Sequence, residues 1–516
     1  MKKIIINLFL ISFLLLGIFL IILSIYGIET EKFNGLISNK VNEANNNTRV
    51  RFNKINFKLD IDEISLFLET TNPQINYRGA EIPTKYVKVY LDFISLIKTS
   101  PKIKKIKVGL NELNLNQIKK LSFIIKPSNL KNIVTNNINS GNLISEFEIY
   151  FDENNSPKNF IARGSVNNLS IQVKKDINFK NTNFDFFADK SDILIKNIFG
   201  KFEDLEIKEG DLKISVSPVL TLKSNFLTNI RIKNKLTKLN LDYLPNYEIL
   251  NDLLSFDANL NNYLQINFDD TYKVKNYSFD SNGEILKAKL KFKKPFSNPF
   301  LKNTIKEISI SNSQIKTYYN SKKKSIEIAG KYSLNGENFL NYEVKTKNEK
   351  KELNLNLNIE YNDDLSLDII NYKKNQGLIA NFSLNFHKHK EKIIFKKIDL
   401  TEKNNKILLE DLKLINNKVI SFKKLSARTY DDGKKNNDFS IFFDKKIKII
   451  GSEFDGTNIP EFINQKGNKT YFSKISKEIE IDLKSIKAPL SENLKNFKLI
   501  GFLDTGRFSK ITAKGD

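Results

Sequence analysis

The chain has 516 residues, with 83 lysines and arginines against 59 aspartates and glutamates, and a formal net charge of +24. It contains no cysteine, which excludes a disulfide framework, a thiolate nucleophile and a cysteine metal site. The charge first suggests a nucleic-acid binder, but the lysines are spread along the chain and mixed with acidic residues. The shared abundance of Lys, Asn and Ile is typical of A·T-rich codons. We therefore expect a solvated cationic surface that attracts anionic lipid head groups, and no nucleic-acid partner.

The first apolar segment predicts a membrane anchor. Residues Ile4 to Ile28 carry no charged side chain, and about 20 apolar residues suffice to cross a hydrocarbon core about 30 Å thick. The alternative is a cleaved signal peptide, but its apolar core is usually about 7–15 residues and ends in a small-x-small site, which Ser24–Ile28 does not provide. Lys2 and Lys3 precede the run, so the positive-inside tendency predicts a cytoplasmic N-terminus and an extracytoplasmic remainder. We expect a single-pass membrane protein anchored by residues 1–28, with a large extracytoplasmic part.

Residues 29–140 form a predicted small α/β region. Apolar residues at intervals of three and four indicate short helices, whereas alternating stretches indicate strands. The predicted helices are Glu29–Asn45, Leu91–Ile97, Leu115–Leu121 and Leu130–Ile138. The predicted strands are Lys54–Leu68 and Val87–Ser95, and Thr71–Pro73 is a predicted turn.

From Leu143 onward the apolar pattern has a period of two, which places apolar and polar side chains on opposite faces of a strand. The turn signals Asn154–Pro157, Asp280–Gly283, Asn335–Gly336 and Asp431–Gly433 predict consecutive antiparallel hairpins. A helix is predicted at Tyr247–Leu254, after Pro245. We therefore expect a mainly β fold in which residues 141–516 form a long, curled antiparallel sheet, an elongated trough. The candidate lining residues of its apolar groove are Leu264, Ile266, Phe268, Leu286, Leu290, Phe292, Leu353, Leu355, Leu357, Ile359, Ile479, Ile481 and Leu483.

Few residues suggest catalysis. The two histidines, His387 and His389, fall on the polar side of an alternating run among lysines, and no third ligand is recognisable nearby. No Ser-His-Asp order, HExxH helix, P-loop or GxGxxG turn is present. The paired acids Asp269-Asp270, Asp363-Asp364 and Asp431-Asp432 fall in predicted turns, where Asp is favoured by local hydrogen bonding. We expect no enzymatic activity, no metal site and no cofactor.

The layout of the chain resembles the AsmA-like family of Gram-negative envelope proteins, which includes relatives of TamB. The matching segments are the anchor running into Tyr26–Thr30, then Leu66–Pro73, Tyr86–Phe93, Ile103–Ile106 and the Gly-x-x-Phe-Asp segment in Ile450–Thr457. The resemblance implies an inner-membrane anchor, a long periplasmic β-trough, and a role in moving phospholipid toward the outer membrane or in envelope integrity. It implies no catalytic residues. The sequence ends inside an alternating run, Ile511–Asp516, where many relatives continue, which leaves open whether it spans the periplasm alone.

The alternating pattern leads independently to the same hypothesis. An apolar sheet face must be covered by protein or by something else, and acyl chains would suit a long uncovered face. We therefore expect a protein that binds or conducts phospholipid acyl chains, with the inner membrane and an outer-membrane or envelope protein as further partners. The alternative is a non-enzymatic envelope scaffold or outer-membrane protein assembly factor with a packed β core. A surface adhesin is a weaker third option, because no signal for export past an outer membrane is visible.

Overall fold

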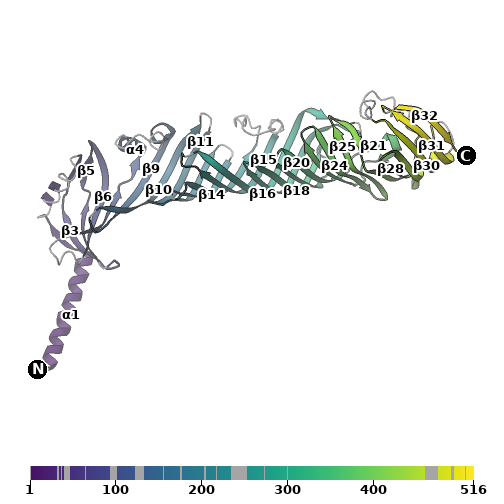
Figure 1. Ribbon diagram of the computed structural model, residues 1–516. Helices are drawn as coiled ribbons and strands as arrows, with labels where there is room; N and C mark the ends of the chain where they lie inside the picture. The colour runs from purple at the N-terminus through teal and green to yellow at the C-terminus, as the bar shows by residue number, and fades with distance from the viewer. Residues whose placement is uncertain are drawn as a thin grey trace. The chain divides into compact units, whose positions relative to one another are not determined.

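The computed structural model describes the chain in segments. They are residues 2–31, 34–35, 38–39, 47–63, 65–92, 102–122, 133–154, 156–174, 177–202, 205–216, 218–233, 253–271, 273–298, 300–458, 475–489, 493–505 and 507–516. The fold is mainly β, with an N-terminal apolar helix and one large, mostly antiparallel sheet that is not closed (Figure 1). This confirms the predicted fold class. Two compact units divide the chain, Met1–Thr228 with Tyr263–Lys275, and Asn229–Asn262 with Asn276–Asp516.

Helix α1, Lys2–Ile25, is the apolar segment predicted as the anchor. Its residues Lys3–Ile25 are long and apolar enough to cross a membrane, and only 6% of its most apolar stretch is buried within the protein. Side chains such as Phe9 and Leu14 are 71% and 63% exposed. A helix that is apolar on all sides and uncovered by protein is typical of a membrane span.

Beyond α1, the described part of the first unit is a sheet of short and then longer strands, with the helix α4 and the π-helical turn η1. Apolar and polar residues alternate along most of its segments, and this period of two favours β-strands over α-helices. Neighbouring strands of the sheet follow the order β1, β3, β4, β6, β7, β9, β10, β11, β12 and β13, and each pairs antiparallel with the next. The strands β2, β5 and β8 lie outside this series. The elements are β1 (Ile28–Thr30), β2 (Thr48–Arg51), β3 (Ile55–Asp60), β4 (Ser65–Thr71), β5 (Gln74–Tyr77), β6 (Ala80–Leu91), β7 (Ile103–Leu110), β8 (Leu113–Asn114), α4 (Leu115–Ser122), η1 (Ile133–Asn137), β9 (Ile138–Phe151), β10 (Pro157–Lys174), β11 (Ile177–Asp189), β12 (Asp192–Phe202) and β13 (Leu205–Ser215).

The division between the two units falls within β14 (Thr221–Ile232), β15 (Leu253–Phe268) and β16 (Val274–Phe296). The predicted domain border at residue 140 lies inside the first unit, where β7 and β9 are direct partners.

The second unit continues with antiparallel partners from β16 to β32 and one parallel pair, β29 with β30. Between β20 and β23 the chain leaves the sheet to form β21, the short helix η3 and β22, while β20 and β23 pair directly. The elements are β17 (Ile305–Asn320), β18 (Lys323–Leu334), β19 (Leu340–Glu349), β20 (Glu352–Tyr361), β21 (Leu365–Leu367), η3 (Asp368–Ile370), β22 (Tyr372–Lys374), β23 (Ala380–His389), β24 (Lys392–Glu402), β25 (Asn405–Ile415), β26 (Lys418–Ser421), β27 (Lys424–Asp431), β28 (Lys434–Phe443), β29 (Ile447–Asp455), β30 (Lys477–Lys487), β31 (Asn493–Asp504) and β32 (Arg507–Lys514).

Several predicted turns are confirmed. Asn335-Gly336 and Asp432-Gly433 have positive φ at both residues, 52° and 82°, and 45° and 77°. Two consecutive positive φ values define the type I′ turn that matches the twist of a hairpin. The predicted helix Leu115–Leu121 is confirmed as α4.

The other predicted helices are not seen as α-helices in the described residues that are reported next. The described part of Leu130–Ile138 forms the π-helical turn η1. Glu29 and Thr30, the start of the predicted helix Glu29–Asn45, belong to β1 instead, because Ile28–Thr30 pairs with Ile55–Phe57. Tertiary pairing there overrides a local helical spacing. Most of the remaining residues of the predicted helix Glu29–Asn45 lie outside the described residues. The same holds for residues 93–97 of the predicted helix Leu91–Ile97 and for residues 247–252 of the predicted helix Tyr247–Leu254. Leu253 and Leu254 begin β15.

The predicted turn at Asp280–Gly283 is wrong. These residues lie in the middle of β16, which continues through them to Phe296. Glycine is required there by a close approach of two backbones, since a Cβ at Gly283 would lie 2.0 Å from the carbonyl oxygen of Asn259. A glycine within a strand marks such an approach as readily as a turn.

Replacing Gly283 by Ala should therefore destabilise the second unit by about 1–3 kcal/mol, the usual cost of forcing extra volume into a packed position. The full chain in detergent would be unfolded with urea and followed by circular dichroism. Asn282→Ala, at the exposed neighbouring position, is the matched control. Equal midpoints for the two variants would contradict the close approach.

Candidate functional site

A long apolar row crosses the second unit. Residues directly opposite each other on neighbouring strands share a face of the sheet, and on one face the partners are apolar from strand to strand. We call this set the long apolar row. It comprises Ile315, Ile328, Val344, Leu357, Leu384, Ile398, Leu409, Leu425, Ile441, Ile449, Ile481, Leu499 and Ala513.

The side chains of the long apolar row are incompletely covered. Those from Ile315 to Leu499 are all half-buried, and Ala513 is exposed. A packed two-layer core would bury such a row fully. The row takes about twelve strand-to-strand steps of ~4.8 Å, so it extends on the order of 60 Å. It is thus a long apolar strip with part of its surface accessible.

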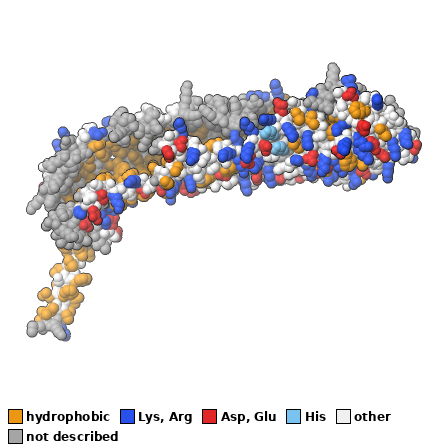
Figure 2. All heavy atoms as spheres, viewed as in Figure 1, with side chains coloured by type: hydrophobic (Ala, Val, Ile, Leu, Met, Phe, Trp, Pro, Cys, Tyr) orange, Lys and Arg blue, Asp and Glu red, His pale blue; other side chains and the backbone are white. Residues whose placement is uncertain are grey.

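A similar row in the first unit begins where the membrane helix ends. We call it the anchor-side row, and its members are Ile28, Phe57, Leu68, Val89, Ile106, Ile149 and Phe160. Ile28 lies three residues after the end of α1 and is 50% exposed, and Phe160 at the far end of the row is 43% exposed. Figure 2 shows hydrophobic side chains gathered in the hollowed face of this part of the chain. The anchor-side row therefore starts at the level where α1 would leave a bilayer.

A neighbouring row on the same face of the first unit extends the apolar surface. Its members are Val87, Val108, Phe147, Ala162, Ala188, Ile193 and Ile214. Phe147 is 37% exposed.

The opposite face of the second unit is polar. Asn356 lies between Lys345 and Asn385 in register, and Lys397 follows next to Asn385. A surface recess on this face is lined by these same four residues among others. Such a recess offers amide and ammonium groups and does not suit an acyl chain.

The two histidines lie on this polar face. His387 Nδ1 is 2.9 Å from Asn354 Oδ1, and His389 Nδ1 is 3.8 Å from Glu352 Oε1. Within the described segments, no three His, Cys, Asp or Glu side chains are grouped so that they could hold a metal ion. The acid pairs contribute to turns as their positions predict: Asp269 Oδ1 accepts hydrogen bonds from the backbone N–H groups of Thr271 and Lys273 at 2.9 and 3.0 Å.

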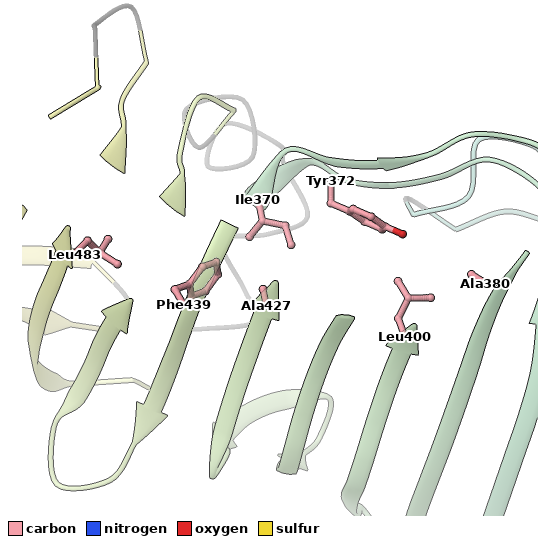
Figure 3. Packing of buried hydrophobic residues seen from close by; sticks show 7 residues of the cluster. All are labelled: Ile370, Tyr372, Ala380, Leu400, Ala427, Phe439 and Leu483. Carbon is pink, nitrogen blue, oxygen red and sulfur yellow. The ribbon is translucent and has the colours of Figure 1, made fainter. Parts of the chain in front are cut away.

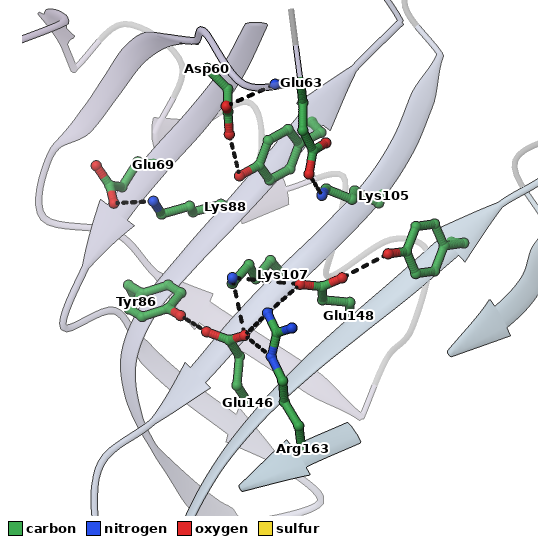
Figure 4. A network of polar contacts seen from close by, with 12 residues as sticks. Asp60, Glu63, Glu69, Tyr86, Lys88, Lys105, Lys107, Glu146, Glu148 and Arg163 are labelled. Carbon is green, nitrogen blue, oxygen red and sulfur yellow. Dashed lines mark hydrogen bonds and ion pairs between the residues drawn. The ribbon is translucent and has the colours of Figure 1, made fainter. Parts of the chain in front are cut away.

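The polar face of the first unit carries a network of ion pairs (Figure 4). Arg163 Nη2 donates to Glu146 Oε1 at 2.5 Å and to Glu148 Oε1 at 2.8 Å, and Lys107 Nζ is 3.0 Å from Glu146. Tyr86 OH also donates to Glu146. These groups come from β6, β7, β9 and β10, so the network ties four consecutive strands together. It fixes the register that keeps the apolar partners aligned on the other face.

Electrostatics in this network favours the charged carboxylate. Burial raises the pKa of the Glu146 carboxyl, but the hydrogen bonds from Tyr86, Arg163 and Lys107 outweigh burial and bring that pKa to about 2. Further along the same face, Lys105 is only 4% exposed, and its Nζ lies 4.3 Å from the centroid of the Tyr90 ring. Lys105 also pairs with Glu63.

The structure places the predicted lining residues in two environments. Leu353, Leu355, Leu357 and Ile359 alternate with exposed or half-buried polar residues and remain half-buried on the apolar face. Leu264, Ile266, Phe268, Leu290 and Phe292 are also half-buried. In contrast, Ile479 and Leu483 are 6% and 2% exposed and belong to packed clusters. These two residues of β30 are covered by the chain itself and offer no free lining, whereas Ile481 between them is half-buried.

Leu286 is half-buried, like the other candidate lining residues of β15 and β16. Its neighbours Ile285 and Ala288 in β16 are buried. Strict alternation cannot place residues three apart on one face. Asn312 in the partner strand has a φ of 44°, and the β17–β18 register shifts between Ser311 and Gln314. Such irregularities re-aim neighbouring side chains.

Sequence reasoning missed the segment of residues 362–379, which we call the insert. Ile370 and Tyr372 from the insert are 6% and 1% exposed and pack on the apolar face of the second unit. The signal available in the sequence was a break in the alternation after Tyr361, followed by the apolar pair Ile369-Ile370 and a Gly at position 377.

Comparison with known proteins gave no match: no family model, no curated protein and no solved structure is similar to this chain. The geometry of the two units therefore carries the functional argument.

The Glu146 network predicts a pH dependence of local stability. A carboxyl whose pKa falls on folding stabilises the fold above its unfolded pKa, and that contribution is lost as pH falls from about 4.5 to about 2. At pH 7, Glu146→Gln should reduce the protection of β9 and β10 amides against hydrogen exchange by about tenfold, since hydrogen bonds to charged groups contribute about 1.5–3 kcal/mol before solvent screening. Well below pH 2, where the carboxyl is protonated in both states, the two proteins should converge. A difference that persists there would contradict the assignment.

Proposed function

We propose that this chain is a membrane-anchored protein that binds phospholipid acyl chains along the apolar rows of its sheet. In this proposal α1 spans an inner membrane with its N-terminus in the cytoplasm, and the sheet lies in the periplasm. Lipid moves toward the outer membrane, in line with the resemblance to AsmA-like proteins, and the chain performs no chemical step. The observation that carries the proposal is the long apolar row, which is continuous across the second unit and only half-buried.

The energetics of an acyl chain support this proposal. Keeping a methylene group in apolar surroundings is worth about 0.8 kcal/mol. A tail that leaves a bilayer for an uncovered row of Leu, Ile and Val side chains retains much of that stabilisation. Because the row repeats similar side chains at each strand, it offers no single deep site. A tail would therefore meet similar free energies at successive positions, which favours sliding over tight binding.

The position of the anchor-side row gives such a path a starting point. The row begins at Ile28, and the strand that contains it pairs with β3. With α1 in a bilayer, Ile28 would lie next to the lipid head groups. Close to this point Lys54 pairs with Glu29 at 2.6 Å, which links the strand that carries Ile28 to the residue before β3.

The packed clusters of the second unit favour a second candidate, a non-enzymatic scaffold or assembly factor. Phe443, Ile447 and Ile479 form one such cluster, with exposures of 8%, 7% and 6%. If all rows were filled in this way, the sheet would have a purely structural role. The half-buried residues of β17–β20 favour lipid binding instead.

The double substitution Leu355→Asp with Leu357→Asp should reduce labelling by a photoactivatable phospholipid by roughly tenfold or more, since an Asp in a hydrocarbon environment costs about 2.5–3.5 kcal/mol. The full-length protein would be reconstituted with the lipid probe, irradiated and analysed for protein-bound lipid. Asn354→Asp with Asn356→Asp adds the same charge on the opposite face of β20 and should label like the unmodified protein. Circular dichroism of both variants checks the fold.

The two candidates give different results in this experiment. Unchanged labelling of the Leu355→Asp, Leu357→Asp variant would remove the lipid-binding proposal. Labelling of the unmodified chain no higher than that of an unrelated membrane protein would favour the scaffold.

A further inference from the structure

The insert, residues 362–379, stands outside the sheet yet lies on its apolar face. β20 and β23, the strands on either side of it in the sequence, are direct partners from Glu352–His389 to Tyr361–Ala380. The sheet therefore does not need β21 or β22 for its pairing. Whatever holds the insert in place is separate from the hydrogen bonding of the sheet.

The insert covers a specific part of the apolar face. Ile370 and Tyr372 point toward Leu400, Ala427 and Phe439 (Figure 3). The covered residues form a cross-strand row next to the long apolar row on the same face: Phe382, Leu400, Ile407, Ala427, Phe439, Gly451 and Leu483. Of these, Ala427 and Leu483 are each only 2% exposed. Leu425, Ile441, Ile449 and Ile481 of the long apolar row pack against this same cluster.

The tip of the insert is held by amide groups at the ends of β28 and β29. Asn371 Nδ2 donates to Asp455 Oδ2 at 3.0 Å, and Asn458 Nδ2 donates to Asn371 Oδ1 at 3.0 Å. Asn437 Nδ2 donates to the Ile370 carbonyl at 2.7 Å. Asn371 has a φ of 47°, a conformation that Asn and Gly tolerate best. Asn436 Nδ2 also donates to the Asn371 carbonyl at 3.3 Å, so the turn at the tip is held through the side chain of Asn371 and through its backbone.

The base of the insert is held separately. Asn303 Nδ2 donates to both carboxylate oxygens of Asp363, at 2.9 and 3.1 Å, and Leu301 forms a backbone bridge with Leu365. Lys374 is 1% exposed, and its Nζ donates to the carbonyl of Asp363 at 2.7 Å. With the base fixed and the tip held by a few side-chain contacts, the tip can lift while the sheet and the base stay intact.

On this basis, we propose that the insert is a displaceable cover that competes with acyl chains for the apolar face of β24–β29. In the closed arrangement Ile370 and Tyr372 occupy the surface that a lipid tail would occupy. In the open arrangement the covered row joins the half-buried surface of β17–β20 into one continuous path. The inference rests on the proposed function and adds a regulated step to it.

The test uses a photo-crosslinking residue, p-benzoylphenylalanine, at one of two positions in the full chain in membranes with radiolabelled phospholipid. At Leu357 it reports the uncovered row, and at Phe439 it replaces one aromatic side chain with another beneath the insert. Each probe is combined with one of three states of the insert. They are the native insert, the Asn371→Gly variant that keeps the backbone conformation but loses the side-chain contacts, and an Ile370→Cys, Ala427→Cys pair joined by a short thiol crosslinker. The chain has no native cysteine, so Ile370→Cys alone, treated with the same reagent, is the matched control.

A displaceable cover predicts a clear pattern. Lipid labelling at Phe439 should rise several-fold in Asn371→Gly and fall to background in the crosslinked pair, while labelling at Leu357 stays the same in all three. Equal lipid labelling at Phe439 in the locked and native proteins would overturn the inference. So would the absence of labelling at Phe439 even in Asn371→Gly, because the insert would then be a permanent part of the core. Absence of lipid at Leu357 in every state would instead remove the proposed function itself, and the cover with it.

Discussion

Cross-strand register is the constraint on which the rest of this structure depends. A single strand with alternating side chains has an apolar face of only a few residues. A continuous apolar row arises only when each strand is aligned so that its apolar residues meet those of the next one, since a shift of one residue would turn them to the opposite face. In the second unit this alignment is kept from Ile315 to Leu499. It survives the change from antiparallel to parallel pairing between β29 and β30, where Ile449 meets Ile481.

The residues that maintain this register lie mostly away from the apolar face. Tight turns such as Asp432-Gly433, which directly joins the paired residues Asp431 and Lys434, fix the offset of two strands because only one geometry closes the hairpin. In the first unit the ion pairs among Lys107, Glu146 and Arg163 bind strands across the polar face. A sheet that leaves its apolar face partly uncovered has less packing to hold it together. Polar cross-strand contacts of this kind compensate on the opposite side, and they leave the apolar side free.

Much of the fold follows from the sequence because alternation and turn chemistry are local. Residues close to one another in the chain are enough to predict three features. They are the alternating strand Leu353–Ile359, the helix that begins at Leu115 and the turn at Asp432-Gly433. Contacts between segments that are distant in the chain do not follow from the local sequence. Asn371 meets Asp455 across 84 residues, and nothing in either segment alone indicates the partner. Bulges are not predictable from one strand alone for a related reason: the burial of both Ile285 and Ala288 accompanies an irregularity in the neighbouring strand.

The same limit applies to the candidate site. Alternation predicts which side chains of a strand share a face. It cannot predict whether that face is covered, because the cover comes from elsewhere in the chain. Ile479 and Leu483 have the same local pattern as Leu355 and Leu357, yet the first pair is buried and the second is half-exposed.

Partial cover has a physical rationale in a protein that would carry lipid. A fully open apolar strip of this length would attract other apolar surfaces, including other copies of the chain. A fully packed one would leave no room for an acyl chain. The insert is attached at its base and covers part of the apolar face with two apolar side chains, Ile370 and Tyr372. It therefore lowers the risk of association with other apolar surfaces. The insert is held on the sheet by contacts with amides and with two carboxylates, those of Asp455 and Glu402, so displacing it breaks no pairing within the sheet. The free energy of opening is then set by this small set of contacts, and a lipid tail that takes the place of Ile370 and Tyr372 would restore much of the burial that opening removes.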